Sequence, residues 1–327
     1  MKEYKILALL APGDAMPEVL LKNENVSIAY PYLRGTSFTA RVIRKFLLCI
    51  GLADLYFIFS LRNVDFKLFD VILVNENVYP LQIIKYIRKE NKKCEIYYWL
   101  WNTLFTRSRR LYNAHKHWND LLKEQKVYNY QIVSFDKKDC NRYNLIYNEQ
   151  VAPIYDCFIN TQELKKDVFF GGMDKGRLEL LKKIGAIFNK KSISYEFWVL
   201  AENRRQYTRE EWDLYLHNNF LSYNSFLQKE LESKCILEIV QDKQNGITWR
   251  PLEALFYKKK LITNFTGIVN YDFYNPDNIF ILGKDDLNKI AEFIKKPYIS
   301  IDENIIQKYT FKKWIKRLLA KDKNLLY

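Results

Sequence analysis

The chain has 327 residues, 48% of them hydrophobic, which is enough for about two domains with buried cores and excludes general disorder. Lysine and arginine total 52 against 38 acidic residues, giving a formal net charge of +14. This excess favours an anionic partner: nucleic acid, nucleotide phosphates or an acidic membrane surface.

The N-terminal segment contains only a short apolar stretch, Ile6–Pro12. It is far shorter than a membrane span, and no signal-peptide cleavage region follows it. We therefore expect a cytoplasmic protein.

Short apolar runs alternate with helical segments through the first half, which is the pattern of β-α-β units around a parallel sheet. The expected strands are Lys5–Leu10, Leu55–Ser60, Phe69–Asn75, Glu95–Trp101 and Tyr130–Phe135. The expected helices are Ser37–Cys49, Pro80–Lys89 and a basic segment ending at Lys126. Residues 136–165 are polar and poorly periodic, so we place an interdomain connection near 152–165.

The second half restarts the same alternation. Its expected strands are Asp167–Gly172, Ser194–Leu200, Cys235–Val240 and Lys260–Thr263. Its expected helices are Arg177–Phe188, Tyr223–Ser233 and Arg250–Tyr257. The sequence therefore predicts an α/β protein with two Rossmann-like domains, at 1–160 and 161–304.

A basic amphipathic helix is expected at the C-terminal end, over Asn304–Leu319 within a third segment, 305–327. Its apolar positions are Phe311, Trp314, Ile315, Leu318 and Leu319. Residues 305–327 contain seven Lys/Arg and one Asp. Two interpretations stay open: the helix packs against the domains with a solvated basic face, or it lies on anionic lipid together with a second basic stretch at 107–126.

The strongest local signal lies between an expected strand and an expected helix, at residues 244–254. Gly246 allows backbone N–H groups to approach a phosphate closely, and the helix N-terminus after Thr248 adds unpaired donors. Arg250 can add a charge-assisted bond, and Glu253 can accept both hydrogens of a ribose diol. The alternative is an ordinary β-α loop with Thr248 as helix cap and Glu253 as a first-turn acid.

A second loop of the same kind follows the first strand of the second half. It contains Gly172, Lys175 and Arg177 before the next expected helix. Ligands of open α/β sheets bind at the carboxyl ends of the strands, so both loops could face one anion. Neither loop matches the P-loop or the Gly-x-Gly-x-x-Gly fingerprint, which disfavours ATPase and dehydrogenase functions.

The sequence from Ile236 to Thr263 resembles the C-terminal signature of GT-B glycosyltransferases, particularly bacterial capsule and lipopolysaccharide sugar transferases. The residues that carry the resemblance are Ile236-Leu-Glu-Ile-Val, Gly246, Glu253-Ala254-Leu and Lys259-Lys260-Leu261-Ile262-Thr263. The family's fold implies two Rossmann-like domains facing a cleft, with a C-terminal helix crossing back to the N-terminal domain.

The resemblance also implies a set of donor-binding residues. Gly246 and Thr248 would bind the donor diphosphate and Glu253 the ribose, while Lys175 and Arg177 resemble the basic pair after the first strand of the C-terminal domain. Tyr223 would lie near the base. The remaining expected donor-site residues are Gly172, Asn245 and Arg250.

The chain departs from the family at one position. Many retaining members carry a glutamate eight positions before the ribose-binding glutamate, where this chain has Asn245. Retention and inversion of the sugar configuration both stay open. Inverting members use an acidic residue or His of the N-terminal domain as general base, for which we choose Asp14, with Glu76 as the alternative.

Metal dependence is not expected. No Asp-x-Asp sequence occurs, and the five cysteines are scattered singly without Cys-x-x-Cys spacing. Charge on the leaving diphosphate would then be stabilised by Lys175, Arg177, Arg250 and helix N-termini. No cofactor is expected, because the nucleotide sugar is a substrate.

We therefore expect a glycosyltransferase that moves a sugar from a nucleotide-activated donor to a glycan or lipid-linked glycan acceptor in bacterial surface polysaccharide synthesis. Trp99, Trp101 and Asn102 are the expected acceptor-binding residues, with core packing as the alternative for at least one tryptophan. If the acceptor is lipid-linked, the cytoplasmic protein would be peripheral on the inner face of the membrane. A nucleic-acid-binding protein and a non-catalytic GT-B-like scaffold are the alternatives; the chain shows no recognised nucleic-acid motif.

Overall fold

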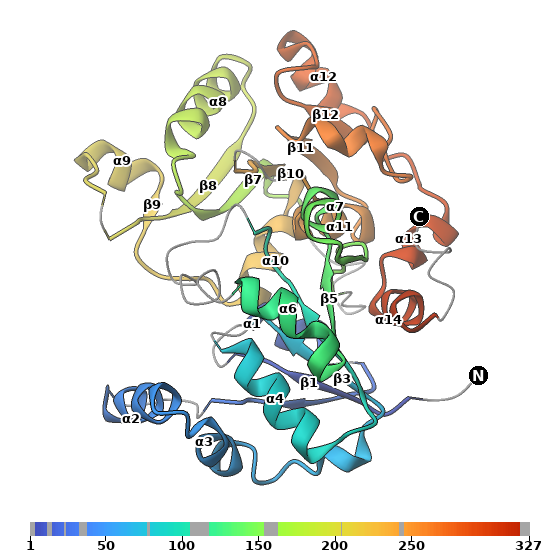
Figure 1. Ribbon diagram of the computed structural model, residues 1–327. Coiled ribbons are helices and arrows are strands. Elements are labelled where there is room, and N and C mark those ends of the chain that lie inside the picture. The colour runs from blue at the N-terminus through green and yellow to red at the C-terminus, as the bar shows by residue number, and fades with distance from the viewer. Residues whose placement is uncertain are drawn as a thin grey trace. The chain divides into compact units, whose positions relative to one another are not determined.

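The computed structural model describes residues 4–11, 15–22, 24–32, 38–76, 79–104, 118–153, 163–203, 205–241 and 245–320 (Figure 1). The chain forms two compact units. Unit 1 comprises Met1–Glu149, Lys243–Gly246 and Ile315–Tyr327, and unit 2 comprises Gln150–Asp242 and Ile247–Trp314.

Unit 1 is built on a six-stranded sheet with the order β2-β1-β3-β4-β5-β6, in which all neighbours are parallel. Its strands are β1 (Ile6–Leu9), β2 (Val26–Ala29), β3 (Val71–Asn75), β4 (Glu95–Trp99), β5 (Gln131–Ser134) and β6 (Ile146–Tyr147). The described helices are α1 (Ala15–Leu21), α2 (Phe38–Cys49), α3 (Ala53–Ser60), α4 (Pro80–Glu90), α6 (Trp118–Tyr128) and α7 (Lys137–Tyr143). β1 and β3 are buried along their whole length, as strands covered on both faces must be.

One expected strand of unit 1 is wrong. Residues 55–60 belong to helix α3, and the neighbour of β1 on its outer side is β2 instead. A short apolar run is compatible with either structure, because periodicity cannot separate a buried strand from a helix of this length. In α3 the apolar residues are not all buried: Tyr56 and Phe57 face the core, while Leu55, Ile58 and Phe59 are exposed.

Unit 2 has a second six-stranded sheet, with the order β12-β11-β10-β7-β8-β9 and parallel neighbours throughout. Its strands are β7 (Lys166–Met173), β8 (Tyr195–Leu200), β9 (Leu216–His217), β10 (Ser233–Glu238), β11 (Lys260–Thr263) and β12 (Ile279–Ile281). The described helices that lie wholly in this unit are α8 (Leu178–Lys190), α9 (Arg209–Leu214), α10 (Tyr223–Leu231), α11 (Trp249–Phe256), α12 (Ile290–Lys295) and α13 (Glu303–Lys308). Two parallel six-stranded sheets confirm the expected fold class of two Rossmann-like units.

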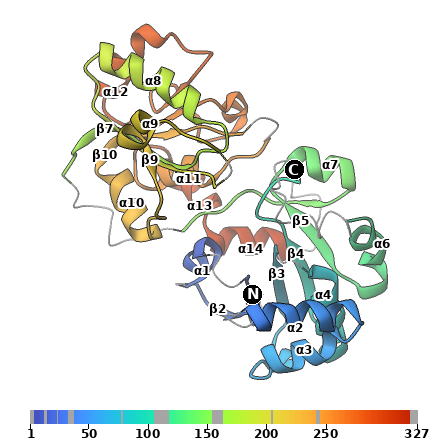
Figure 2. The same ribbon diagram turned by 90° about the vertical axis from the view of Figure 1, so that its left-hand side faces the viewer.

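The single C-terminal helix expected over 304–319 is two helices, α13 and α14 (Phe311–Leu319; Figure 2). The first ends at Lys308, and the backbone carbonyl of Thr310 accepts from Trp314 N at 2.9 Å to begin the second. Ile315–Tyr327 belongs to unit 1, where Arg317 Nε donates to Asn148 Oδ1 at 3.2 Å.

Helix α14 buries its apolar face, comprising Phe311, Trp314, Ile315 and Leu318. Lys312, Lys313 and Lys316 on the opposite face are exposed. This arrangement matches the interpretation in which the helix packs against protein with its basic face in water. Among the described segments, every helix is too short or too polar to span a bilayer.

Candidate functional site

Glu253 is the centre of a buried polar cluster in unit 2. It lies one turn into α11 and is 0% exposed. Tyr223 donates its phenolic hydrogen to Glu253 Oε1 at 2.8 Å, and Arg250 Nη1 donates to Oε2 at 2.9 Å. Burial and the neighbouring Glu253 charge raise the pKa of Tyr223, so the phenol stays protonated as a donor.

A second carboxyl group, Glu230 of α10, lies on the other side of the Arg250 guanidinium. Its Oε1 is 3.0 Å from Arg250 Nε, and the side chain is fully buried. Burial raises the pKa of Glu230 well above the ordinary value, and the nearby Glu253 raises it further. Burial alone would lower the pKa of Arg250, but Glu230 and Glu253 outweigh it and the pKa is raised overall. The guanidinium therefore stays charged inside the protein.

Thr248 positions α11, and its hydroxyl group is engaged within the protein. Its Oγ1 accepts from Arg250 N at 3.1 Å, which makes it the helix cap. The hydroxyl donates to Glu238 at the end of β10, and Thr263 Oγ1 donates to the second oxygen of Glu238 at 2.6 Å. Burial raises the pKa of Glu238. Thr248 thus serves as a cap, and any contact with a phosphate would use backbone groups or a change in this hydroxyl bond.

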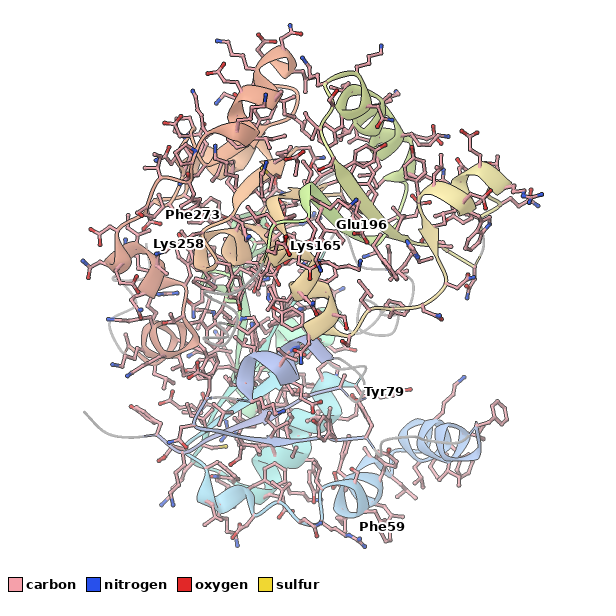
Figure 3. All side chains as sticks on the ribbon, turned by 180° about the vertical axis from the view of Figure 1, so that it is seen from behind. Phe59, Tyr79, Lys165, Glu196, Lys258 and Phe273 are labelled. Carbon is pink, nitrogen blue, oxygen red and sulfur yellow. The ribbon has the colours of Figure 1, made fainter. Side chains whose placement is uncertain are left out.

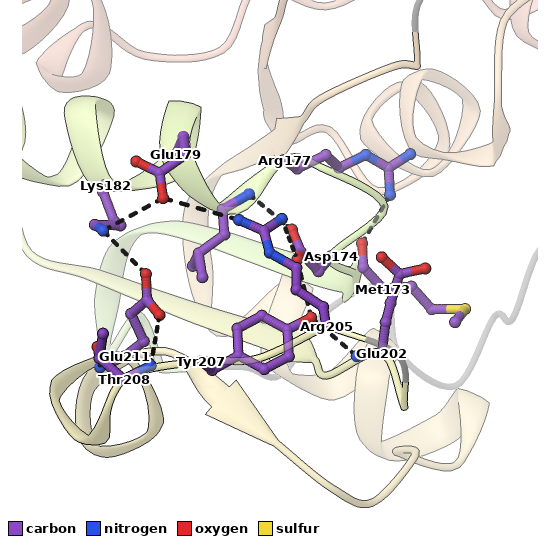
Figure 4. A network of polar contacts seen from close by, with 11 residues as sticks. Met173, Asp174, Arg177, Glu179, Lys182, Glu202, Arg205, Tyr207, Thr208 and Glu211 are labelled. Atoms are coloured by element: carbon purple, nitrogen blue, oxygen red, sulfur yellow. Dashed lines mark hydrogen bonds and ion pairs between the residues drawn. The ribbon is translucent and has the colours of Figure 1, made fainter.

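The loop after β7 lies beside this cluster, because β7 and β10 are neighbours in the sheet. Asp174 is buried and organises the loop: Oδ1 accepts from Leu178 N at 2.9 Å, and Oδ2 accepts from Arg205 and Tyr207 at 2.7 and 2.9 Å (Figure 4). Lys175 has a positive φ of 43° and an exposed side chain. Nearby protein atoms and the charge of Arg177 lower the pKa of Lys175.

Arg177 and Arg250 converge on the last residues of β7. Arg177 Nη1 donates to Met173 O at 3.1 Å, and Arg250 Nη2 lies 3.5 Å from Gly171 O. Burial lowers the pKa of Arg177, and its Nε has no hydrogen-bond partner among the described residues. Figure 4 shows the Arg177 side chain extending from the start of α8 toward the Met173 carbonyl.

Two neighbouring glycines of β7 have different surroundings. A Cβ at Gly171 would lie 2.2 Å from Phe226 Cε2, whereas one at Gly172 would meet nothing closer than 3.7 Å. Phe226 also packs under Arg250, with the guanidinium carbon 4.1 Å from the ring centroid. The missing side chain of Gly171 therefore makes room for the ring that supports Arg250.

The other expected loop residues, Asn245 and Gly246, belong to unit 1. A Cβ at Gly246 would lie 2.5 Å from Phe135 Cδ2, and Asn245 N donates to Asp136 Oδ2 at 3.4 Å. Gly246 thus permits a close approach of the chain to Phe135. This packing is a structural reason for glycine at a position that the sequence analysis assigned to phosphate binding.

Two of the expected acceptor residues, Trp101 and Asn102, bond to Glu76 in unit 1. This buried carboxyl group accepts from Trp101 N at 3.3 Å, Asn102 N at 3.0 Å and Asn102 Nδ2 at 2.9 Å. Trp99 is buried and packs edge to face against half-buried Trp101, with centroids 4.8 Å apart. Trp99 therefore has a core role. Asp14, the chosen general base, and residues 107–117 of the basic stretch lie outside the described residues.

The structure brings together four of the site residues expected from the sequence: Tyr223, Arg250, Glu253 and Arg177. The sequence analysis did not name Glu230 and Glu238 as site residues. Glu230 had a signal: Leu227, Glu230 and Leu231 fall on one buried helix face, where a lone acid is unusual. Glu238 had another, because it is the only charged residue in Cys235–Val240. The part of the chain that the structure describes contains no group of three or more His, Cys, Asp or Glu able to hold a metal ion.

Comparison with known proteins identifies the fold. Neither a protein-family model nor a curated protein sequence matches the chain. A UDP-forming α,α-trehalose-phosphate synthase from Burkholderia vietnamiensis is similar in structure, with a TM-score of 0.52, 10% identity, and coverage of 99% of this chain and 96% of that one. A glycosyltransferase from Rickettsia africae gives a TM-score of 0.51, 11% identity, and 100% and 99% coverage. The parallel sheets and these whole-chain similarities show that the chain has the two-domain GT-B fold.

Proposed function

We propose that the protein is a glycosyltransferase that uses a nucleotide-activated sugar and a glycan or lipid-linked glycan acceptor. One observation carries this proposal: the guanidinium groups of Arg177 and Arg250 meet at the carboxyl end of β7, beside the buried Glu253. Two fixed positive charges at this edge of a parallel sheet suit a diphosphate. The solved structures of similar fold include a UDP-forming synthase, which is consistent with a nucleotide-sugar donor.

The chemistry assigned to the site is electrostatic stabilisation. As the glycosidic bond to the diphosphate breaks, negative charge grows on the leaving phosphate oxygens, and Arg177, Arg250 and Lys175 would stabilise it. We propose that these cations act without a metal ion. Glu253 would bind the ribose, since each carboxylate oxygen has acceptor capacity beyond its bond to Tyr223 or Arg250. Asp14 remains the proposed general base, and Trp101 with Asn102 the proposed acceptor contact.

We also propose a biological setting: bacterial surface polysaccharide synthesis, in the cytoplasm, with peripheral attachment to the inner face of the membrane. The support is the excess of positive charge, +14 over the chain, together with the resemblance of residues 236–263 to capsule and lipopolysaccharide transferases. Assays with undecaprenyl-linked and free oligosaccharide acceptors test this setting directly.

A thermal-shift screen against UDP, GDP, ADP, CDP and CMP, with and without EDTA, tests the donor site. A ligand that binds only the folded state stabilises it by about 2.7 kcal/mol at one hundred times its Kd. A selective shift that EDTA does not alter supports the metal-free donor site and names the nucleotide. Absence of any shift contradicts the proposal.

The Glu253→Gln variant makes the test specific. Its amide keeps the shape but loses one acceptor oxygen, so we expect at least about tenfold weaker binding of the selected nucleotide by calorimetry. Glu292→Gln is the matched control, because Glu292 is an exposed acid of α12 in an i,i+4 pair with Lys296. Equal affinities in a folded Glu253→Gln protein would remove Glu253 from the site.

A non-catalytic GT-B scaffold is the second candidate. Asn245, at the place of the glutamate of many retaining members, and the enclosure of Glu253 both favour it. Nucleotide release from the donor, measured with and without acceptor, separates the two candidates. A scaffold would bind the nucleotide and release nothing above the uncatalysed rate.

A further inference from the structure

Helices α2 and α3 present an exposed apolar surface on unit 1. Phe38, Val42 and Phe46 recur at every fourth position of α2, which places them along one side of the helix, and Ile50 follows directly after its end. Phe38 is 74% exposed and Phe46 is 61% exposed. A continuous stripe of this kind differs from single apolar residues on a surface, which need no explanation.

Helix α3 extends the same surface. Leu55, Ile58 and Phe59 fall on one side of it, and Phe59 is 63% exposed (Figure 3). The two helices lie side by side at the edge of unit 1 in Figures 1 and 2. On the inner side, Tyr56 and Phe57 are buried and Leu47 packs against the core. The helix pair is therefore anchored on its inner side, while Phe38, Phe46 and Phe59 on the outer side are mostly exposed.

The charges beside this face select its occupant. Lys45 of α2 and Arg62 after α3 are exposed. The sequence from 38 to 62 contains four bases, Arg41, Arg44, Lys45 and Arg62, and Asp54 is its only acid. A symmetric dimer through this face would bring the same basic segment of each copy together. An anionic lipid surface instead offers hydrocarbon for the aromatic side chains and negative headgroups for the bases.

We propose that α2 and α3 form a membrane-contact face, defined by Phe38, Val42, Phe46, Ile50, Ile58 and Phe59, that inserts at the surface of an anionic bilayer. This assigns attachment to unit 1. Helix α14 does not supply an inserting face, since Phe311 and Trp314 are buried. The inference rests on the peripheral attachment proposed above and names the surface that makes it. Its test is separate from that of the transferase activity, because binding to lipid needs neither donor nor acceptor.

Sedimentation with vesicles of phosphatidylglycerol and phosphatidylcholine tests the proposal on the full chain. We expect wild-type protein to bind the mixed vesicles and to bind pure phosphatidylcholine at least about tenfold more weakly. Phe46→Ser with Phe59→Ser should lower the partition coefficient about tenfold or more, because two large apolar side chains no longer leave water. Phe220→Ser is the matched control: Phe220 is 75% exposed in unit 2 and should not affect binding.

The melting temperature and fluorescence quenching distinguish lost lipid binding from unfolding and locate the inserting residues. Exposed positions should tolerate serine, so an unchanged Tm of the double variant shows that lost binding is not unfolding. The fluorescence added by Phe46→Trp should be quenched by brominated acyl chains, and the fluorescence added by Phe220→Trp should not. Unchanged vesicle binding by the double variant overturns the proposal, as does a lipid-free dimer that the double variant dissociates, since the occupant would then be a second copy.

Discussion

Tyr223 and Glu253 are joined by a hydrogen bond of 2.8 Å that links the start of α10 to the first turn of α11. The two residues are distant from each other in the sequence, so the bond connects two separate β-α connections of unit 2. It also holds a buried carboxyl group whose other oxygen is bound by Arg250.

Replacing Tyr223 with Phe should destabilise the protein by about 1–3 kcal/mol, because Glu253 Oε1 loses the phenol as its donor in a buried site. Urea unfolding of wild type and variant measures the loss. Tyr274→Phe is the control, since that hydroxyl bonds to no residue that the structure describes; it should cost less than about 0.5 kcal/mol. Equal costs for the two variants would show that the Tyr223 bond contributes nothing specific.

Glu230 should make stability depend on pH. Its folded-state pKa is raised above the ordinary 4.5, so the folded protein binds its proton more tightly than the unfolded chain. This contribution is complete below about pH 4.5 and is lost as the pH rises toward the folded-state pKa. Relative to wild type, Glu230→Gln should therefore gain stability from pH 5 to pH 8, by up to about 1.4 kcal/mol per pH unit.

The Glu232→Gln variant should show the opposite pH dependence of the free energy of unfolding. The hydrogen bond and charge of Lys165 lower the pKa of Glu232, so its contribution is present at neutral pH and is lost as the pH falls through the folded-state pKa. Chemical denaturation from pH 3 to pH 8 gives both differences. If the difference in the free energy of unfolding between wild type and the Glu230→Gln variant does not change with pH, the raised pKa of Glu230 is refuted.

Alanine at the two β7 glycines should have unequal effects. Gly171→Ala places a Cβ against the Phe226 ring and should cost about 1–3 kcal/mol by overpacking, whereas Gly172→Ala has room. Because Phe226 supports Arg250, Gly171→Ala should also weaken nucleotide binding. Thermal unfolding and calorimetry measure the two effects. A second change, Phe226→Leu, should restore stability, and failure to do so would place the strain elsewhere.

The Arg177→Gln variant should distinguish contacts to the phosphates from contacts to the nucleoside. We expect the affinity for the selected nucleoside diphosphate to fall about tenfold or more, because one charge-assisted contact is lost, while binding of the corresponding nucleoside is unchanged. The salt dependence of diphosphate binding should also decrease. Equal weakening for nucleoside and diphosphate would mean that Arg177 shapes the site without touching phosphate.

The sequence predicted elements well where burial on both faces leaves an unbroken apolar run. β3 is such a strand: Val71–Asn75 is buried throughout, and its expected range differs from the observed one by two residues at the start. The same reasoning failed at residues 55–60, because one side of α3 is apolar yet exposed. Composition alone cannot separate an apolar residue that packs in a core from one kept for a partner.

The sequence could predict those residues of the site that lie in the loops between a strand and the following helix. Arg177 and Arg250 stand at corresponding places after two strands, and the sheet order brings those strands together. Their partners were harder to find, because they depend on long-range packing. Thr263 and Glu238 lie on adjacent strands but are 25 residues apart in the sequence, so no local spacing predicts the bond between them.

The division of the chain into units has a consequence for biosynthesis. Unit 1 takes its first residues from the beginning of the chain and its last from 315 onward, where Arg317 bonds to Asn148. A ribosome must therefore produce all of unit 2 before unit 1 can finish folding, and a fragment ending at Glu149 would leave the surface that receives Ile315 and Leu318 uncovered. During translation the nascent N-terminal half thus lacks the segment from Ile315 that belongs to unit 1, and unit 1 can be completed only after unit 2 has been synthesised.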